Sequence, residues 1–135
     1  MRTVLVDDDY ISIFLTKKLL EQEGLADELS TFLLPEKALH YVQQAIATEQ
    51  IPDVILLDLN MPMLNGWEFI EALRPDEQHL LGRCFIYVLT SSLAPSDMVR
   101  ANDFPLVTSL IHKPLDDIQI QAIHTQVLES RQSGQ

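Results

Sequence analysis

The chain has 135 residues, of which 47% are hydrophobic and 21% charged, which fits one globular domain with a substantial core. Its formal net charge of −11 argues against direct binding to nucleic acid, because that binding depends on lysine and arginine neutralising phosphates. No apolar stretch approaches the roughly 20 residues needed to cross a bilayer, and aspartates at positions 7–9 interrupt the N-terminal apolar run before it reaches the length of a signal-peptide core. We therefore expect a cytoplasmic domain that binds neither nucleic acid nor membrane.

Apolar runs alternate with helical patterns in the N-terminal part of the chain. Strands are predicted at Thr3–Val6, Glu28–Phe32 and Val54–Leu57. The first helical pattern is formed by four apolar residues at helical spacing, namely Ile11, Phe14, Leu15 and Leu19. Gly24 follows it as a stop, and Asp9 precedes it as the expected N-cap. A second helix begins at Pro35, a residue suited to a first helical turn, and continues to about Ile46.

The C-terminal part repeats the same alternation. A short helix through Trp67, Ile70 and Leu73 is expected to end before Pro75, and Pro95 opens another around residues 97–102. The last two strands are predicted at Phe85–Leu89 and Leu106–Ile111. The last helix is marked by four apolar residues, Ile120, Ile123, Val127 and Leu128. The stretch 74–83 is expected to lengthen the loop before the fourth strand.

Five strands alternating with five helices predict an α/β fold, a doubly wound parallel sheet with helices on both faces. Several strands are continuous Val, Ile and Leu runs, as expected for strands buried on both sides. The only cysteine, Cys84, adjoins one such run, so we expect a buried and unreactive thiol. We expect one domain at residues 1–129 and a polar tail at residues 130–135.

Polar residues follow the predicted strands at their carboxyl ends. Asp7 and Asp8 follow the first strand, Asp58 the third, Thr90 the fourth and Lys113 the fifth. Ligands of open α/β sheets bind at this edge, so these side chains are expected on one rim. Clustered carboxylates resist joint ionisation unless a cation lies among them, and carboxylates that leave positions open for phosphate suit Mg²⁺. The set predicts phosphoryl transfer to a carboxylate.

These motifs, in this order, resemble the signature of response-regulator receiver domains of two-component signalling. The matching segments are Asp7-Asp8 after Val4-Leu5-Val6, Asp58-Leu59-Asn60-Met61-Pro62 with Gly66, Thr90-Ser91, and Lys113-Pro114. The resemblance extends from Arg2 to about Glu129. It implies a flavodoxin-like (βα)5 fold with strand order 2-1-3-4-5. It also implies a stand-alone signalling switch, not a conventional enzyme, that catalyses its own phosphorylation and dephosphorylation in a phosphorelay.

The resemblance also implies a role for each matching residue. Asp58 corresponds to the phosphoacceptor that attacks a phosphohistidine of a sensor histidine kinase or phosphotransfer protein and becomes an aspartyl phosphate. Asp8 corresponds to a direct Mg²⁺ ligand and Asp7 to a ligand through water. Asn60 corresponds to the residue whose backbone carbonyl completes the metal site. The remaining two matches are Thr90, the switch hydroxyl, and Lys113, the partner of the phosphoryl group.

The resemblance further implies an output surface, formed by the fourth helix, fifth strand and fifth helix over residues 96–102, 107–111 and 118–127, for an unnamed downstream protein. Leu110 stands where many relatives carry an aromatic switch residue. The Lys113–Pro114 bond is a candidate cis peptide. For Gly66, in an Asn-Gly turn signal, we expect a backbone geometry that other residues resist.

Three other hypotheses remain open at this point. A haloacid-dehalogenase-like phosphatase would use Asp7 and Asp9, with Asp116 and Asp117 as a second metal pair, but it leaves Asp58 without a role. A degenerate receiver would bind a partner without phosphorylation, although the acids, Thr90 and Lys113 are all present. Flavin binding is disfavoured by the acidic rim and by the lack of a glycine-rich or Ser/Thr-rich phosphate loop after the first strand.

Overall fold

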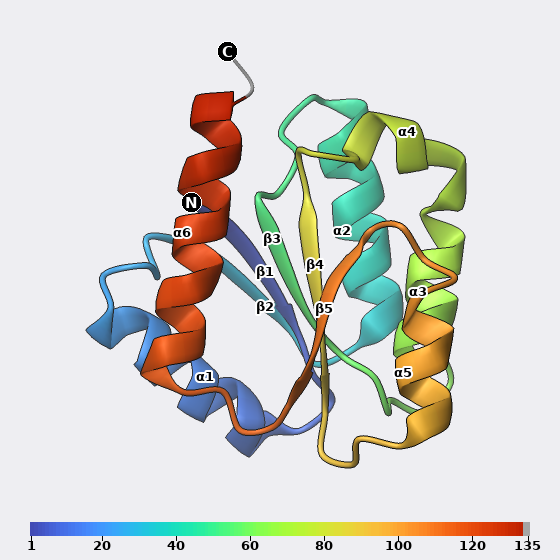
Figure 1. Cartoon of the computed structure of the whole chain (residues 1–135), viewed down its shortest axis with the longest axis horizontal. Coiled ribbons are helices and arrows are strands. Elements are labelled where there is room, and N and C mark those ends of the chain that lie inside the picture. The colour runs from blue at the N-terminus through green and yellow to red at the C-terminus, as the bar shows by residue number, and fades with distance from the viewer. Residues whose placement is uncertain (134–135) are drawn as a thin grey trace.

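A computed structural model describes residues 1–133 as a five-stranded parallel sheet covered by helices on both faces (Figure 1). The strands are β1 (Arg2–Val6), β2 (Glu28–Phe32), β3 (Val54–Asp58), β4 (Phe85–Thr90) and β5 (Val107–His112). They are arranged in the order β2-β1-β3-β4-β5, as the resemblance implies. All neighbouring pairs are parallel, so the five carboxyl ends share one edge of the sheet.

The five main helices begin and end close to their predicted positions. They are α1 (Tyr10–Gln22), α2 (Pro35–Ala47), α3 (Gly66–Ala72), α5 (Pro95–Ala101) and α6 (Asp117–Ser133). Two short elements lie between α3 and β4, the 3₁₀ helix η1 (Arg74–Asp76) and α4 (Glu77–Leu80). The predicted fourth and fifth helices are therefore α5 and α6, and the expected loop at residues 74–83 is partly helical.

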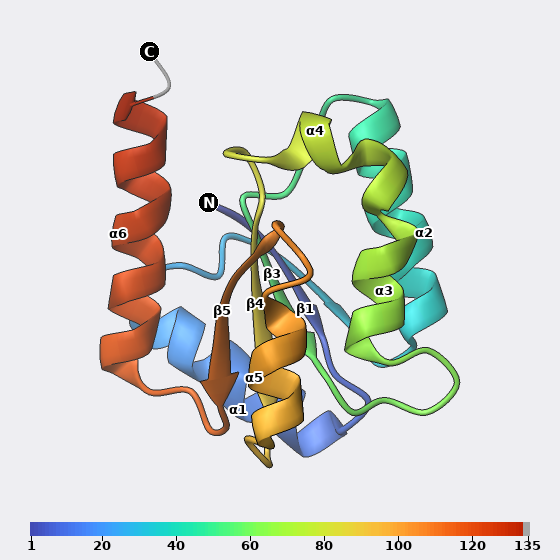
Figure 2. The same ribbon diagram turned by 45° about the vertical axis from the view of Figure 1, so that its right-hand side comes forward.

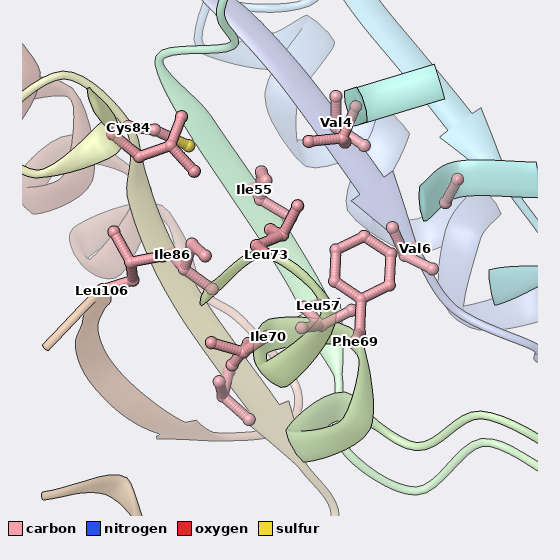
Figure 3. Close-up of a cluster of buried hydrophobic side chains, with 14 of the residues drawn as sticks. Val4, Val6, Ile55, Leu57, Phe69, Ile70, Leu73, Cys84, Ile86 and Leu106 are labelled. Carbon is pink, nitrogen blue, oxygen red and sulfur yellow. The ribbon is translucent and has the colours of Figure 1, made fainter. Parts of the chain in front are cut away.

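Alternate strand residues face two separate apolar clusters, one on each side of the sheet. Val4, Ile55 and Ile86 point toward α2 and α3, where they pack with Phe69 and Ile70 (Figure 3). On the other side the strands pack against α1 and α6, and α1 contributes Ile13 and Leu20. The turned view in Figure 2 shows the sheet between these two helical layers. The prediction that continuous apolar runs form strands buried on both faces is confirmed for the three inner strands, β1, β3 and β4.

The residues that α1 buries are not the ones whose apolar spacing predicts the helix. Ile11, Phe14 and Leu15 are 66%, 50% and 58% exposed, whereas Ile13 and Leu20 are buried. Apolar residues occur on more than one side of this helix, so the spacing predicts a helix but not which face packs on the sheet. Gly24, the predicted stop, adopts a φ of +71° just after the helix ends, a conformation that other residues rarely adopt.

The C-terminal segment differs from the predicted tail at residues 130–135. Helix α6 continues to Ser133, and residues 134–135 lie outside the described part of the chain. The Ser130 hydroxyl donates to the carbonyl of Gly82 at 3.0 Å, and Arg131 pairs with Asp53 at 2.7 Å. These contacts tie the end of α6 to the amino-terminal edge of the sheet. None of the helices formed by residues 1–133 is both long and apolar enough to span a bilayer.

Candidate functional site

The carboxyl end of β1 supplies the first two acids of the rim. Asp7 is buried at 1% exposure, whereas Asp8 is exposed. One carboxylate oxygen of Asp7 accepts the backbone N–H of Asp9 at 2.9 Å. Asp9 in turn accepts the backbone N–H of Ile11 at 2.9 Å and caps α1, as the sequence predicts. The start of α1 thus fixes the backbone that carries both acids.

Asp58, the last residue of β3, is 5% exposed. The backbone N–H of the next residue, Leu59, donates to the carbonyl of Leu89 on β4 at 2.8 Å, which extends the sheet pairing past the acid. Because β3 lies between β1 and β4, Asp58 emerges next to the acids of β1.

Gly66 holds the loop after Asp58 tightly against the start of α3. Its N–H donates to the carbonyl of Leu59 at 2.9 Å. A Cβ at position 66 would lie 3.0 Å from the Cα of Leu59 and 3.2 Å from the carbonyl oxygen of Asp58. The expected reason for this glycine, an unusual backbone geometry, is wrong, because the φ of Gly66 is not positive and close approach is what disfavours a side chain here. The positive φ in this loop belongs to Met63 instead, and Asn65 caps α3 together with Glu68.

Lys113 follows β5 and contacts the acids at the ends of β1 and β3. Its ammonium nitrogen lies 2.6 Å from a carboxylate oxygen of Asp7 and 3.4 Å from one of Asp58. A third partner, which the sequence analysis missed, is the hydroxyl of Ser12 on α1 at 3.4 Å. The peptide bond to Pro114 is cis, as predicted. Lys113 and Asp7, which lie 106 positions apart in the sequence, are thus in direct contact.

Asp7, Asp8 and Asp58 each offer a carboxylate oxygen, and these oxygens all lie within 4.8 Å of one another. They are the one such group of three His, Cys, Asp or Glu side chains within residues 1–133. Three hard oxygen donors on one open rim fit Mg²⁺, which binds a few carboxylates and keeps other positions for water and phosphate oxygens. The donor set therefore suits the expected ion.

The surroundings of Asp58 and Lys113 shift the pKa of both groups. Burial, and after it the negative charge of Asp7, raise the pKa of the Asp58 carboxyl to about 7, although the positive charge of Lys113 opposes the rise. For Lys113, burial lowers the pKa, but its hydrogen bond with Asp7 and the charges of both acids outweigh burial and leave the pKa above its usual value. Lys113 therefore stays positively charged. One lysine does not neutralise the three acids Asp7, Asp8 and Asp58.

Thr90 ends β4 with its side chain fully buried. Its hydroxyl donates to the carbonyl of Ser92 at 3.0 Å, and it accepts the backbone N–H of Ser92 at 3.1 Å and the side-chain amide of Asn60 at 3.4 Å. The structure thus brings Thr90 and Asn60 together on the acidic rim. Their roles toward a phosphoryl group and a metal stay predictions.

Asp116 and Asp117, the second metal pair of the phosphatase hypothesis, accept hydrogen bonds from the backbone at the start of α6. Asp116 accepts the backbone N–H of Gln119 at 2.8 Å, and Asp117 accepts that of Ile118 at 3.0 Å.

Cys84 is 3% exposed, and burial raises the pKa of its thiol to about 12, so the predicted unreactive thiol is confirmed.

An exposed apolar face of α1 borders the acidic rim, and the sequence analysis did not identify it as a surface. It consists of Tyr10, Ile11, Phe14 and Leu15, which are between 50% and 70% exposed. A groove of about 380 Å³ meets this face at Leu15, and Ser12 and Lys113 are among its other lining residues. Through Leu15, the apolar face therefore adjoins the groove that contains Lys113, which contacts the acids.

Known proteins resemble the chain in both sequence and structure. The family model described as the response regulator receiver domain matches residues 3–125. Hybrid signal transduction histidine kinase C of Dictyostelium discoideum is 30% identical over 117 residues, which cover 84% of this chain and 9% of that protein. Hybrid signal transduction histidine kinase L of the same organism is 27% identical over 123 residues, 90% of this chain and 7% of that protein. The chain thus spans less than a tenth of either curated relative.

Solved structures match nearly the whole chain. A two-component response regulator from Cytophaga hutchinsonii superposes with a TM-score of 0.87 at 27% identity, covering 95% of this chain and 96% of that one. A response regulator receiver protein from Dyadobacter fermentans gives a TM-score of 0.81 at 30% identity, covering 95% and 98%. The five-stranded fold is that of these receiver structures.

Proposed function

Because this chain belongs to the response regulator receiver family, we propose that it is a switch in which Asp58 accepts a phosphoryl group in a Mg²⁺-dependent reaction. The donor is a phosphohistidine of a histidine kinase or of a phosphotransfer protein, and the switch acts in the cytoplasm. The observation that carries the proposal is the convergence of Asp7, Asp8 and Asp58 within 4.8 Å, with Lys113 beside two of them.

Asp58 is the nucleophile. One of its carboxylate oxygens forms a bond to phosphorus while the bond between phosphorus and the donor imidazole nitrogen breaks, and the electron pair of that bond stays on the imidazole. Asp8 would bind Mg²⁺ directly, Asp7 through water and Asn60 through its carbonyl. The ion, when bound, supplies positive charge to the transferring phosphoryl oxygens. This charge also favours the ionised form of Asp58, which burial disfavours.

Lys113 and Thr90 respond to the new charge. Lys113 lies 3.4 Å from Asp58, so its ammonium reaches the phosphoryl group with little movement. The Thr90 hydroxyl has one proton, which it donates to Ser92, so bonding to the phosphoryl group requires it to leave that carbonyl. This exchange of partners moves the loop that leads into α5.

We place the output surface on α5, β5 and α6, at residues 96–102, 107–111 and 118–127. The unpaired edge of β5 has a groove of about 270 Å³ on the α5 side and one of about 570 Å³ on the α6 side. Leu93 and Leu110 line both, so a displacement of the loop after Thr90 alters the shape of both grooves. A downstream protein that fits one shape discriminates between the two states.

The donor protein docks on the exposed apolar face of α1. The groove that meets this face at Leu15 is also lined by Lys113, so a protein seated on the face places its phosphohistidine next to the acids. Four large apolar side chains in contact with water are a favourable surface for a protein partner. A small phosphodonor such as acetyl phosphate needs no such surface.

The nucleophile is tested by incubating the protein with acetyl phosphate and Mg²⁺ and measuring its intact mass. Phosphorylation that is lost in Asp58→Asn but retained in Asp7→Asn, at a reduced rate because a metal ligand is missing, supports the proposal. The reverse result would support the phosphatase hypothesis. Phosphorylation of neither the wild type nor Asp7→Asn would support a receiver that binds its partner without phosphorylation.

A further inference from the structure

Trp67 connects the loop after Asp58 to the output helix α5. It is the only tryptophan of the chain, follows Gly66 in the first turn of α3 and is 5% exposed. Its indole N–H donates to a carboxylate oxygen of Asp97, in the first turn of α5, at 3.4 Å. Phe104, in the segment after α5, stacks on the Trp67 ring at 5.4 Å between centroids with an interplanar angle of 9°.

The path from Asp58 to Trp67 has little freedom. Gly66 is hydrogen-bonded to Leu59, and the Cα of Gly66 packs so closely on Leu59 that a Cβ there would lie 3.0 Å from the Cα of Leu59. Packed elements transmit small displacements because they leave no space to absorb them. A shift of the backbone next to Asp58 therefore reaches Trp67 through the start of α3.

Helix α5, by contrast, is weakly attached to the rest of the protein. All seven of its residues are described, none is buried, and only Asp97 and Ala101 are shielded from solvent in part. Its position therefore depends on few contacts, and the hydrogen bond from Trp67 is one of them. Elements with few buried contacts open at low free-energy cost and are the ones that move in switches.

On these grounds we propose that the hydrogen bond between Trp67 and Asp97 is a latch that holds α5 in its resting position and is released when Asp58 is phosphorylated. Trp67 is thereby a positioning residue that couples the phosphorylation loop to the output surface, on a route separate from Thr90. The inference rests on the proposed phosphorylation of Asp58. The indole N–H of Trp67 carries the signal, and Leu110 on β5 is not required for this route.

The test measures amide hydrogen exchange of the α5 peptide, with and without acetyl phosphate and Mg²⁺. Trp67→Phe removes the N–H donor but keeps a ring to stack on Phe104, and Asp97→Asn weakens the acceptor while leaving the indole in place. Asp103→Asn, an exposed acid just after α5, is the control for the change in charge. Intact mass reports phosphorylation in each sample, so a wild type that is never phosphorylated would refute the proposed function and is recognised separately.

In the wild type we expect phosphorylation to speed exchange of α5 about fivefold, which corresponds to losing a hydrogen bond of about 1 kcal/mol. In Trp67→Phe and Asp97→Asn, exchange of α5 should already be about fivefold faster without phosphorylation, and phosphorylation should speed it less than twofold further. The double variant should exchange at the same rate as either single variant. Asp103→Asn should behave as the wild type. The latch would be overturned if Trp67→Phe or Asp97→Asn still showed the full fivefold response to phosphorylation. It would also be overturned if either substitution sped up exchange of α5 by the same factor with and without phosphorylation.

Discussion

Burial of the Asp58 carboxylate next to Asp7 predicts that Asp58→Asn stabilises the metal-free protein above neutral pH. Burial and the charge of Asp7 raise the pKa of Asp58 from 3.8 to about 7. At about 1.4 kcal/mol per pH unit, keeping this carboxylate ionised in the folded state costs at most about 4 kcal/mol. Relaxation of the side chains and entry of water reduce this cost, so we expect a gain of about 2 kcal/mol, or about 7 °C in Tm.

The sign of the pH dependence follows from the direction of the shift. A carboxyl whose pKa is higher in the folded state than in the unfolded state stabilises the fold while it is protonated. The wild type should therefore lose stability relative to Asp58→Asn as pH rises from about 4 to about 7. Above pH 7 the difference should stay constant.

The assay is urea unfolding in EDTA at several pH values between 5 and 9, followed by far-UV circular dichroism. Asp53→Asn is the matched control, because this acid lies at the opposite edge of the sheet and accepts hydrogen bonds from Arg131 and from the backbone N–H of Arg2, both at 2.7 Å. It should lose about 1 kcal/mol. Equal stability of Asp58→Asn and wild type at pH 8, or a gain that shrinks as pH rises, would refute the electrostatic reasoning.

Three further changes test other parts of the site. Phe14→Ala, on the exposed face of α1, should slow transfer from a phosphohistidine protein at least tenfold without slowing phosphorylation by acetyl phosphate. A variant that accepts the phosphoryl group from the phosphohistidine protein as fast as the wild type would exclude docking there. Gly66→Ala should cost about 1–3 kcal/mol in urea unfolding, because its Cβ would lie 3.2 Å from the carbonyl oxygen of Asp58, and a neutral change would show that the loop has room. Lys113→Ala should leave Mg²⁺ binding, measured by calorimetry, largely intact but abolish the effect of phosphorylation on partner binding, and unchanged partner binding would contradict the role of this lysine.

Much of the fold was predictable because the strands carry a strong local signal. The runs at Val54–Leu57 and Phe85–Leu89 are continuous, apolar and bounded by polar residues, and each strand proved only one residue longer, at Asp58 and at Thr90. Both added residues are candidate site residues, because the strand pairing continues until the chain reaches the rim. The strand order came from the resemblance, because alternation of strands and helices alone is compatible with several orders.

What the sequence did not predict depends on contacts between distant segments. Helix α1 has apolar residues on several sides, so only packing decides that Ile13 is buried and Phe14 exposed. The hydrogen bond of Ser12 with Lys113 joins residues 101 positions apart, and no local pattern indicates it. Likewise, the reason for a glycine at position 66 is the backbone of Leu59 packed against it, which spacing does not reveal.

The most direct test of the central claim is to locate the phosphate. The protein is phosphorylated with acetyl phosphate and Mg²⁺, reduced with borohydride, which converts an aspartyl phosphate to homoserine, and sequenced by tandem mass spectrometry. We predict homoserine at position 58, dependent on Mg²⁺ and lost in EDTA. Homoserine at position 7, 8 or 9 in its place, or at none of the four acids, would contradict the account.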